Sequence, residues 1–311
     1  MPGLPPARYA YLGPEGTFCE TALRSLPAAD STEHLPCVSV ADALDAVRRG
    51  EVNGAVVPLE NSVEGSVAET LDELATGDPL HIVREILLPV TFALMARPGT
   101  ALTSVATVTT MPHAEAQVRQ WLRRELPAAR FVAAPSTADG ARAVAAGSAD
   151  AAVAAPIAAS RYALDVLADD IADTAGAVTR FVLVTRPAPP PPPTGADRTT
   201  VMAFIADDHP GALLELLTEF AVRGVNLTRI ESRPTGVGLG RYYFSIDAEG
   251  HVAQARVAET LAAIRRECAD VRFLGSYPRA DGVAPEERRG TGDLDFSDAH
   301  AWVERIRRGE S

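Results

Sequence analysis

The sequence contains no lysine, because all 29 of its lysine-or-arginine positions are arginines. Without a lysine amine, the chain can form no Schiff base with a carbonyl substrate or pyridoxal phosphate, and it can build no P-loop. Cysteine is also scarce: Cys19, Cys37 and Cys268 are far apart and lack CxxC spacing. The six histidines are equally scattered, so neither a disulfide framework nor a metal site is predicted.

Long apolar runs are missing as well. No run approaches the roughly 18 residues that cross a bilayer, and residues 1–8 lack the pattern of a signal peptide. The net charge of −12 and the isoelectric point near 5.0 disfavour nucleic-acid binding, which needs a basic surface. We therefore expect a soluble, cytoplasmic protein that binds neither membranes nor nucleic acid, although a local arginine pocket could hold a small anion.

What the chain does have is enough length and apolar content for about two domains of roughly 150 residues each. Hydrophobic residues make up 47% of its 311 positions. Five consecutive prolines, Pro189–Pro193, can enter neither a helix nor a central strand, so residues 187–197 are predicted to be a stiff linker. The first domain is then 7–186 and the second 198–280, followed by a polar tail at 281–311.

The first domain is predicted to be α/β, because short apolar strands alternate with amphipathic helical patterns. Predicted strands are 9–12, 54–57, 105–108 and 151–154, and predicted helices are 41–49, 114–125 and 138–146. Residues 82–97, interrupted by Pro89, look like a strand that passes between two lobes, and 178–184 is a candidate for the return. The expected lobes are 7–83 with 176–186, and 84–175, with a cleft between them.

The second domain has a different order of elements. Strands at 200–205, 226–232, 241–247 and 271–277 and helices at 212–223 and 252–267 give the βαββαβ pattern of a ferredoxin-like fold, with a glycine-rich turn at 236–240. In the tail, Ser297 is predicted to cap a short last helix that carries Trp302 and Ile306.

Two strand-to-helix junctions in the first domain share one pattern. Thr17 begins a T-x-x-E capping box after Gly13-Pro14-Glu15-Gly16, and Ser66 begins an S-x-x-E box; Ser136 gives a weaker third case. Each would place backbone N–H groups at the carboxyl edge of a sheet, where anions are favoured. Ordinary helix capping is the simpler explanation of any one of these junctions taken alone.

Two further segments carry candidate ligand-binding groups. Asn61 and Ser62 are polar where folding does not require it, so their side chains could hydrogen-bond a ligand oxygen. In Thr179-Arg180-Phe181, a guanidinium beside a hydroxyl and an aromatic ring could clamp a carboxylate bidentately. A surface ion pair is the alternative for this arginine.

Together these segments resemble the prephenate dehydratase family. The resemblance is carried by residues 13–18, 58–67 and 179–181, in that order, and it covers about residues 8–279. Gly211-Ala212-Leu213 and Glu231-Ser232-Arg233-Pro234 are similar to the phenylalanine-binding motifs of the ACT regulatory domain of that family. The resemblance implies a two-lobed, periplasmic-binding-protein-like catalytic domain followed by a ferredoxin-like ACT domain.

By resemblance, the enzyme would be a carbon–oxygen lyase that converts prephenate to phenylpyruvate, with loss of carbon dioxide and water, in phenylalanine biosynthesis. Because the ring becomes aromatic as the two groups leave, this reaction would need no cofactor. Thr179 would donate a proton to the leaving ring hydroxyl. The substrate would be held by the following residues: Asn61, Ser62, Arg180, the helix starts at Thr17 and Ser66, and Phe181 as a wall of the cleft.

The resemblance also implies feedback regulation. L-Phenylalanine would bind between the ACT domains of two subunits, which makes the protein a homodimer or a homotetramer. The expected allosteric residues are Gly211, Ala212, Leu213, Asn226, Leu227, Glu231, Ser232, Arg233 and Pro234.

The sequence departs from the family pattern at four places. Cys19 replaces a usual serine, and Phe92 stands where a histidine is common. His113 follows Thr110-Met111-Pro112 in a segment that usually reads Ser-His-Pro-Gln, and Gly176 lies where an asparagine often precedes Thr-Arg-Phe. Two alternatives remain open: an arogenate dehydratase, and a non-catalytic amino-acid-sensing binding protein.

Overall fold

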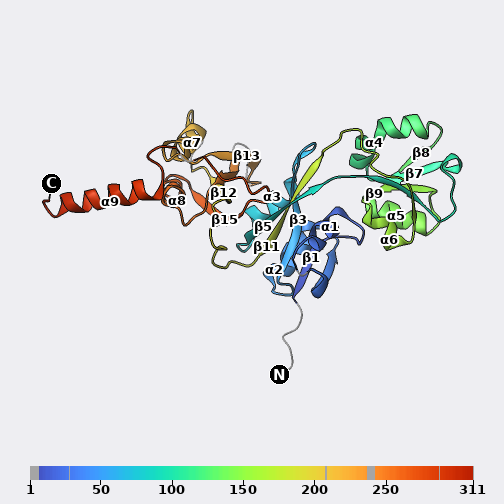
Figure 1. The fold of residues 1–311 in the computed structure, drawn as a ribbon, viewed down its shortest axis with the longest axis horizontal. Coiled ribbons are helices and arrows are strands. Elements are labelled where there is room, and N and C mark those ends of the chain that lie inside the picture. Colours follow the sequence, from blue (N-terminus) through green and yellow to red (C-terminus); the bar gives the residue numbers. More distant parts are fainter. Residues whose placement is uncertain (1–6, 28, 207–208, 237–241, 287, 311) are drawn as a thin grey trace, which may run out of the picture. The chain divides into compact units, whose positions relative to one another are not determined.

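A computed structural model describes residues 7–27, 29–206, 209–236, 242–286 and 288–310 (Figure 1). The chain divides into two compact units, residues 1–70 with 86–183, and residues 71–85 with 184–311. The boundaries between these units fall within α3 (Ala68–Ala75), β5 (His81–Pro89) and β11 (Val178–Thr185).

The first sheet combines strands from the start of the chain with β5 and β11, and has the strand order β2-β1-β3-β11-β5, with β4 paired to β3. β1 runs parallel to β2 and to β3, as the predicted alternation of strands and helices requires. The elements of this part are β1 (Arg8–Leu12), α1 (Phe18–Arg24), the 3₁₀ turn η1 (Ala29–Ser31), β2 (Glu33–Cys37), α2 (Val40–Arg48), β3 (Gly54–Asn61) and β4 (Gly65–Ser66).

The second sheet has the order β10-β6-β9-β7-β8 and forms the other lobe of the first unit. β7 is parallel to β8 and β9, whereas β6 is antiparallel to β9 and β10. Its elements are β6 (Ala93–Ala96), the 3₁₀ turn η2 (Leu102–Ser104), β7 (Thr107–Thr110), α4 (Pro112–Glu125), β8 (Arg130–Ala133), α5 (Thr137–Ala145), β9 (Ala151–Ala154), α6 (Ile157–Tyr162) and β10 (Asp165–Ala168).

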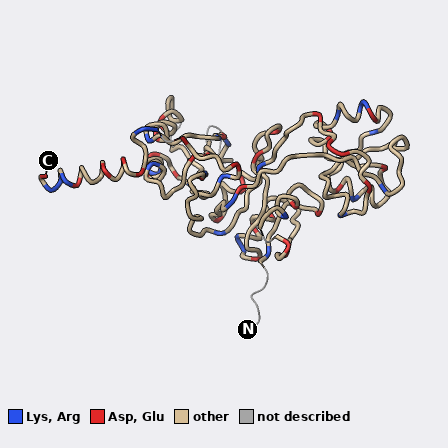
Figure 2. The backbone as a smooth tube through the Cα atoms, viewed as in Figure 1, with Lys and Arg blue, Asp and Glu red and all other residues tan. Residues whose placement is uncertain are grey.

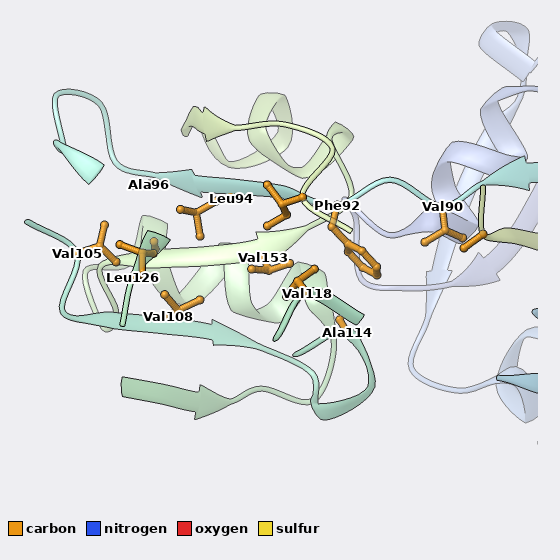
Figure 3. Close-up of a cluster of buried hydrophobic side chains, with 13 residues drawn as sticks. Val90, Phe92, Leu94, Ala96, Val105, Val108, Ala114, Val118, Leu126 and Val153 are labelled. Carbon is orange, nitrogen blue, oxygen red and sulfur yellow. The ribbon is translucent and has the colours of Figure 1, made fainter. Parts of the chain in front are cut away.

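Helices cover both faces of this second sheet, which explains why its central strands β6 and β9 are apolar at every position (Figure 1). Alternate residues of β6 and β9, such as Leu94 and Val153, pack against Val118 of α4 (Figure 3). The intervening positions, such as Met95, pack against α5 and α6. The small side chains on that side allow the two helices to approach the sheet closely.

The second unit contains the ferredoxin-like sheet, with the order β13-β14-β12-β15 and antiparallel pairing throughout its described strands. The predicted βαββαβ order is confirmed. The elements are β12 (Asp197–Phe204), α7 (Ala212–Val222), β13 (Leu227–Pro234), β14 (Tyr242–Glu249), α8 (Ala255–Glu267) and β15 (Asp270–Pro278). Most of the predicted glycine-rich turn lies outside the described residues.

The last helix, α9 (Asp293–Arg307), differs from the prediction. Its N-cap is Gly292, and the predicted cap Ser297 lies inside the helix, where its hydroxyl donates to the carbonyl of Leu294. The prediction was wrong because Asp295 supplies an N-terminal contact of its own, accepting the N–H of Gly292 at 3.0 Å. The helix is consequently longer than expected.

Charged residues of both signs are interspersed along the backbone of each unit (Figure 2). In the described part of the chain, no helix combines the length and the apolar character that a membrane crossing would need.

Candidate active site

The beginning of β11 carries the predicted Thr179-Arg180-Phe181 segment, and all three side chains are buried. Thr179 is 8% exposed and Arg180 is 6% exposed. Because successive side chains of a strand point to opposite faces, Thr179 shares a face with Phe181, whereas Arg180 projects from the other face.

Asn61, at the end of β3, contacts Thr179 directly. Its amide Nδ2 donates to Thr179 Oγ1 at 2.8 Å. Its Oδ1 accepts the backbone N–H groups of Val63 and Glu64, at 2.8 and 3.0 Å. Since the oxygen is committed to these two donors, the amide can turn only its nitrogen toward Thr179.

Ser62 joins the same loop to the first residue of β11. The N–H of Ser62 donates to the carbonyl of Val178 at 2.9 Å, and the N–H of Val178 donates to Ser62 Oγ at 3.0 Å. The structure therefore brings together three of the residues singled out from the sequence, Asn61, Ser62 and Thr179.

Arg180 faces Glu60, whose carboxylate oxygen Oε2 lies 3.7 Å from Arg180 Nη1. Glu60 precedes Asn61 on β3, so the alternation along β3 matches the alternation along β11. Across the two strands, an amide–hydroxyl pair lies on one face and an ion pair on the other.

The turn before α1 is organised by its own side chains. Thr17 is the N-cap of α1, as predicted, and its hydroxyl accepts the N–H of Glu20 and donates to the carbonyl of Leu12. Glu20 Oε2 accepts the N–H of Gly16 at 2.6 Å. Within the described residues, no hydrogen bond joins Thr17 to Asn61 or Thr179.

The S-x-x-E pattern predicted a helix start at Ser66, and the structure places that start later. Ser66 lies in β4, where it pairs with Glu60, and α3 begins two residues later, at Ala68. The short β-hairpin formed by β3 and β4 competes with the capping geometry, and it holds the polar loop that contains Asn61 and Ser62. The predicted cap at Ser136, by contrast, is confirmed.

Contacts between the two lobes of the first unit were not predicted from the sequence. Glu20, 1% exposed, accepts hydrogen bonds from Arg24 and from Arg161 of α6. Burial alone would raise the pKa of the Glu20 carboxyl, but its hydrogen bonds to Gly16 and the two arginines lower the pKa overall. The capping-box pattern indicated a role for Glu20 at the start of its own helix, but it did not predict the contact with Arg161.

Gly16 explains why the turn can lie so close to α6. Its φ is +89°, and a Cβ at this position would come within 3.2 Å of the Cα of Ala158. Tyr162 adds a hydrogen bond from its hydroxyl to the carbonyl of Glu15 at 2.7 Å. Any side chain at residue 16 would push the turn away from the second lobe.

A second contact between the lobes starts from the loop that carries Asn61 and Ser62. Glu64 accepts a hydrogen bond from Gln117 of α4 at 3.1 Å, and its other oxygen lies 3.3 Å from His113 Nδ1. His113 is one of the departures from the family pattern, and its place at the start of α4 gives it this partner.

The other departures also have defined surroundings. Phe92 packs edge-to-face against Phe18, with ring centroids 5.5 Å apart. Burial raises the pKa of the Cys19 thiol to about 12, so this thiol stays protonated near neutral pH. Gly176 has a φ of +79° just before β11.

The predicted regulatory residues lie in the second unit. Gly211, with a φ of +102°, is the N-cap of α7, and Ala212 and Leu216 line a cavity of about 170 Å³. Asn226 donates to Glu249 at 3.2 Å. The remaining motif residues, Glu231, Ser232, Arg233 and Pro234, are in the edge strand β13.

Comparison with known proteins identifies both units. Residues 9–189 match the family model for prephenate dehydratase, and residues 200–266 match the ACT domain. The prephenate dehydratase of Amycolatopsis methanolica is 53% identical over 305 residues, covering 98% of this chain and 99% of that protein. That of Mycobacterium marinum is 48% identical, covering 98% and 97%.

A solved structure agrees over almost the whole chain. The prephenate dehydratase of Arthrobacter aurescens, crystallised in complex with L-Phe, is 50% identical and superposes with a TM-score of 0.93. The match covers 97% of this chain and 100% of that chain.

The fold and the site define a lyase with a two-lobed α/β catalytic domain and a ferredoxin-like regulatory domain. The chain belongs to the prephenate dehydratase family. Its reaction is the decarboxylative dehydration of prephenate, so the resemblance, the fold class and the enzyme class expected from the sequence are confirmed.

Within the described residues, no group of three or more histidine, cysteine, aspartate or glutamate side chains is arranged to hold a metal ion.

Proposed function

We propose that Thr179 donates the proton that allows the ring hydroxyl of prephenate to leave as water. In this reaction the bond from the ring to the carboxylate breaks, and its electron pair enters the ring as the carbon–oxygen bond to the hydroxyl breaks. Carbon dioxide, water and phenylpyruvate result. The alkoxide left on Thr179 is reprotonated from solvent.

The observation that carries this proposal is the hydrogen bond from Asn61 to Thr179 Oγ1. A hydroxyl has one hydrogen and two lone pairs, so an oxygen that accepts from Asn61 still has its own hydrogen to donate. The same amide stabilises the negative charge that develops on Oγ1 as the proton leaves. Asn61 therefore acts on the threonine, and Ser62 holds the loop on β11 and offers its hydroxyl hydrogen to the substrate.

Arg180 is proposed to attract the negative charge of the substrate, which carries two carboxylates. Its buried guanidinium follows Thr179 in sequence but projects from the opposite face of β11, so its proposed role is to attract a substrate carboxylate and not to contact the leaving hydroxyl. The backbone at Thr17 and Ser66 completes the proposed contacts with the carboxylates, and Phe181 forms an apolar wall on the Thr179 face. General acid assistance contributes about 10²- to 10⁴-fold in rate, so positioning must supply much of the remaining acceleration.

Purified protein assayed with prephenate and with arogenate, in parallel, tests the substrate assignment. Formation of phenylpyruvate from prephenate is expected, at a kcat/KM at least tenfold above that for arogenate. The reverse preference would make the chain an arogenate dehydratase, and binding of either compound without turnover would make it a non-catalytic sensor.

For regulation, we propose that L-phenylalanine binds the second unit and inhibits the reaction. Support comes from the matching ACT domain, from the two motifs at Gly211–Leu213 and Glu231–Pro234, and from the L-Phe complex of the relative from Arthrobacter aurescens. Initial rates measured over a range of phenylalanine concentrations should fall, and a flat response up to millimolar concentration would contradict this proposal.

We further propose a homodimer or homotetramer in the cytoplasm. The ACT resemblance implies a site shared by two subunits, and light scattering on the purified chain measures the assembled mass. The three cysteines are free in the structure, as suits a reducing compartment. Cell fractionation checks the compartment.

A further inference from the structure

The sheet of the second unit has one apolar and one polar face, and both are buried. Val201, Ala203 and Ile246 belong to the core that includes residues of α7 and α8. On alternate positions, Thr200 and Asp247 are at most 1% exposed, and Thr200 Oγ1 donates to Asp247 Oδ1 at 2.7 Å. Because strand side chains alternate, these polar residues line the face away from the helices.

Residues 71–85, which we call the α3–β5 segment, pack against this unit. A Cβ on Gly275 of β15 would lie 2.1 Å from the carbonyl oxygen of Ile82, so the two backbones touch. At the end of the segment, Glu85 forms a buried ion pair with Arg198 of β12 and accepts the N–H of Ala280.

At its beginning, the segment is held through Asp72 of α3. The guanidinium of Arg233, on β13, donates two hydrogen bonds to the Asp72 carboxylate, from Nε at 3.2 Å and from Nη2 at 2.6 Å. The hydroxyl of Tyr243 on β14 donates to Asp72 Oδ1 at 2.8 Å. Burial opposes the charge on Asp72, but these donors lower the pKa of its carboxyl, so it is ionised near neutral pH.

The sequence position of Asp72 connects this contact to the candidate active site. α3 begins at Ala68, directly after the hairpin that carries Asn61 and Ser62. Asp72 lies four residues after Ala68, so one turn of helical hydrogen bonding links it to the residues that follow the hairpin. The side chain of Asp72 is nevertheless 46% exposed, and a half-exposed ion pair is weak enough for a ligand to displace.

Arg233 is also part of the Glu231–Pro234 motif proposed to bind phenylalanine. A free amino acid carries an α-carboxylate, which is the same chemical group that Asp72 presents to the guanidinium. We propose that Asp72 is a positioning residue for the active-site hairpin, and that the carboxylate of phenylalanine competes with it for Arg233. This inference rests on the regulation proposed above, and it identifies the ion pair between Arg233 and Asp72 as the contact through which phenylalanine acts.

If Asp72 and phenylalanine compete for Arg233, a change at Asp72 must also change the affinity for phenylalanine. If phenylalanine must displace Asp72 to reach Arg233, removing the Asp72 charge makes phenylalanine bind more tightly. The same change releases α3 and lowers activity in the absence of phenylalanine. A residue that merely stabilised the fold would weaken ligand binding or leave it unchanged.

The test compares Asp72→Asn in the full-length chain with wild type and with Glu69→Gln, which alters an exposed carboxylate on the same helix. Calorimetry measures phenylalanine binding, initial rates give kcat and KM for prephenate, and thermal unfolding checks the fold. For Asp72→Asn we expect binding about fivefold tighter, kcat about fivefold lower with KM little changed, and weak further inhibition. Glu69→Gln should match wild type, and Asp72→Glu should restore part of the activity.

Unchanged binding and kcat in Asp72→Asn would overturn the inference, and so would a loss of phenylalanine binding, which would make Asp72 part of the ligand site itself. If wild type binds no phenylalanine, the proposed regulation fails and the competition fails with it. In that case the positioning role of Asp72 is tested separately, by whether Asp72→Asn lowers kcat.

Discussion

Asn61 Nδ2 lies 2.8 Å from Thr179 Oγ1, although 118 positions separate the two residues in the chain. The amide oxygen of Asn61 is held by two backbone N–H groups, so the direction of this hydrogen bond is fixed. The threonine hydroxyl therefore receives a hydrogen bond from the protein and keeps its own hydrogen for the substrate.

Asn61→Asp tests the direction of that hydrogen bond. A carboxylate accepts the N–H groups of the loop as the amide does, but it cannot donate to Thr179, and its charge opposes an alkoxide nearby. We expect kcat for prephenate to fall about 100-fold, with a smaller change in KM. Ser62→Ala is the comparison, because it keeps the donor to Thr179 and removes a hydroxyl proposed to bind the substrate, so it should raise KM more than it lowers kcat. If Asn61→Asp left kcat within about threefold of wild type, the role given to Asn61 would be contradicted, since loss of the donor should cost much more.

Arg180→Lys tests whether the guanidinium acts on the substrate or only on Glu60. Lysine keeps the positive charge but loses the planar fork. If Arg180 holds a carboxylate, KM for prephenate should rise at least tenfold while the thermal midpoint stays near that of wild type. Glu60→Gln serves as the matched variant. A lower midpoint with an unchanged KM would show that Arg180 is a structural partner of Glu60.

Glu20→Gln tests the buried contact between the lobes of the first unit. The pKa of the Glu20 carboxyl is lower in the folded state than its ordinary value of 4.5. The ionised carboxylate therefore stabilises the fold at pH values above 4.5, and this stabilisation is lost as the pH falls through the folded-state pKa. Urea unfolding at pH 7 should show a loss of about 3 kcal/mol, shrinking as the pH is lowered below 4.5.

Glu115→Gln is the control for this measurement, because it breaks an exposed i, i+4 pair with Arg119 and should cost about 0.5 kcal/mol or less. A Glu20→Gln deficit that is equally small, or that does not depend on pH, would contradict the stabilising role of the ionised carboxylate.

Periodicity was sufficient to predict most of the elements. β9 matches its predicted range, 151–154, and the helix predicted at 212–223 is α7, residues 212–222. These patterns reflect burial on one or both faces of an element, which the local sequence records directly. Cap signals were less reliable: the same short polar motif begins α1 at Thr17 but lies in a hairpin at Ser66, and the cap predicted at Ser297 lies inside α9.

The sequence allowed the pairing of Thr179 with Asn61 to be anticipated only as a proximity, because residues 178–184 were expected to return between the lobes. In the structure the end of β3 meets the start of β11, as in antiparallel neighbours. Which face each side chain takes depends on strand register, and so the separation of Thr179 from Arg180 was not foreseen. The partners of Glu20 and Asp72 depend on how distant elements pack. No local pattern encodes such contacts.

The most direct test of the proposed chemistry is steady-state turnover of prephenate by Thr179→Val and Thr179→Ser. Valine keeps the shape of threonine without its hydroxyl, whereas serine keeps the hydroxyl and loses only a methyl group. We predict that the valine variant loses at least about 100-fold in kcat while the serine variant stays within about tenfold of wild type. Comparable activity in the valine variant and wild type would contradict this prediction.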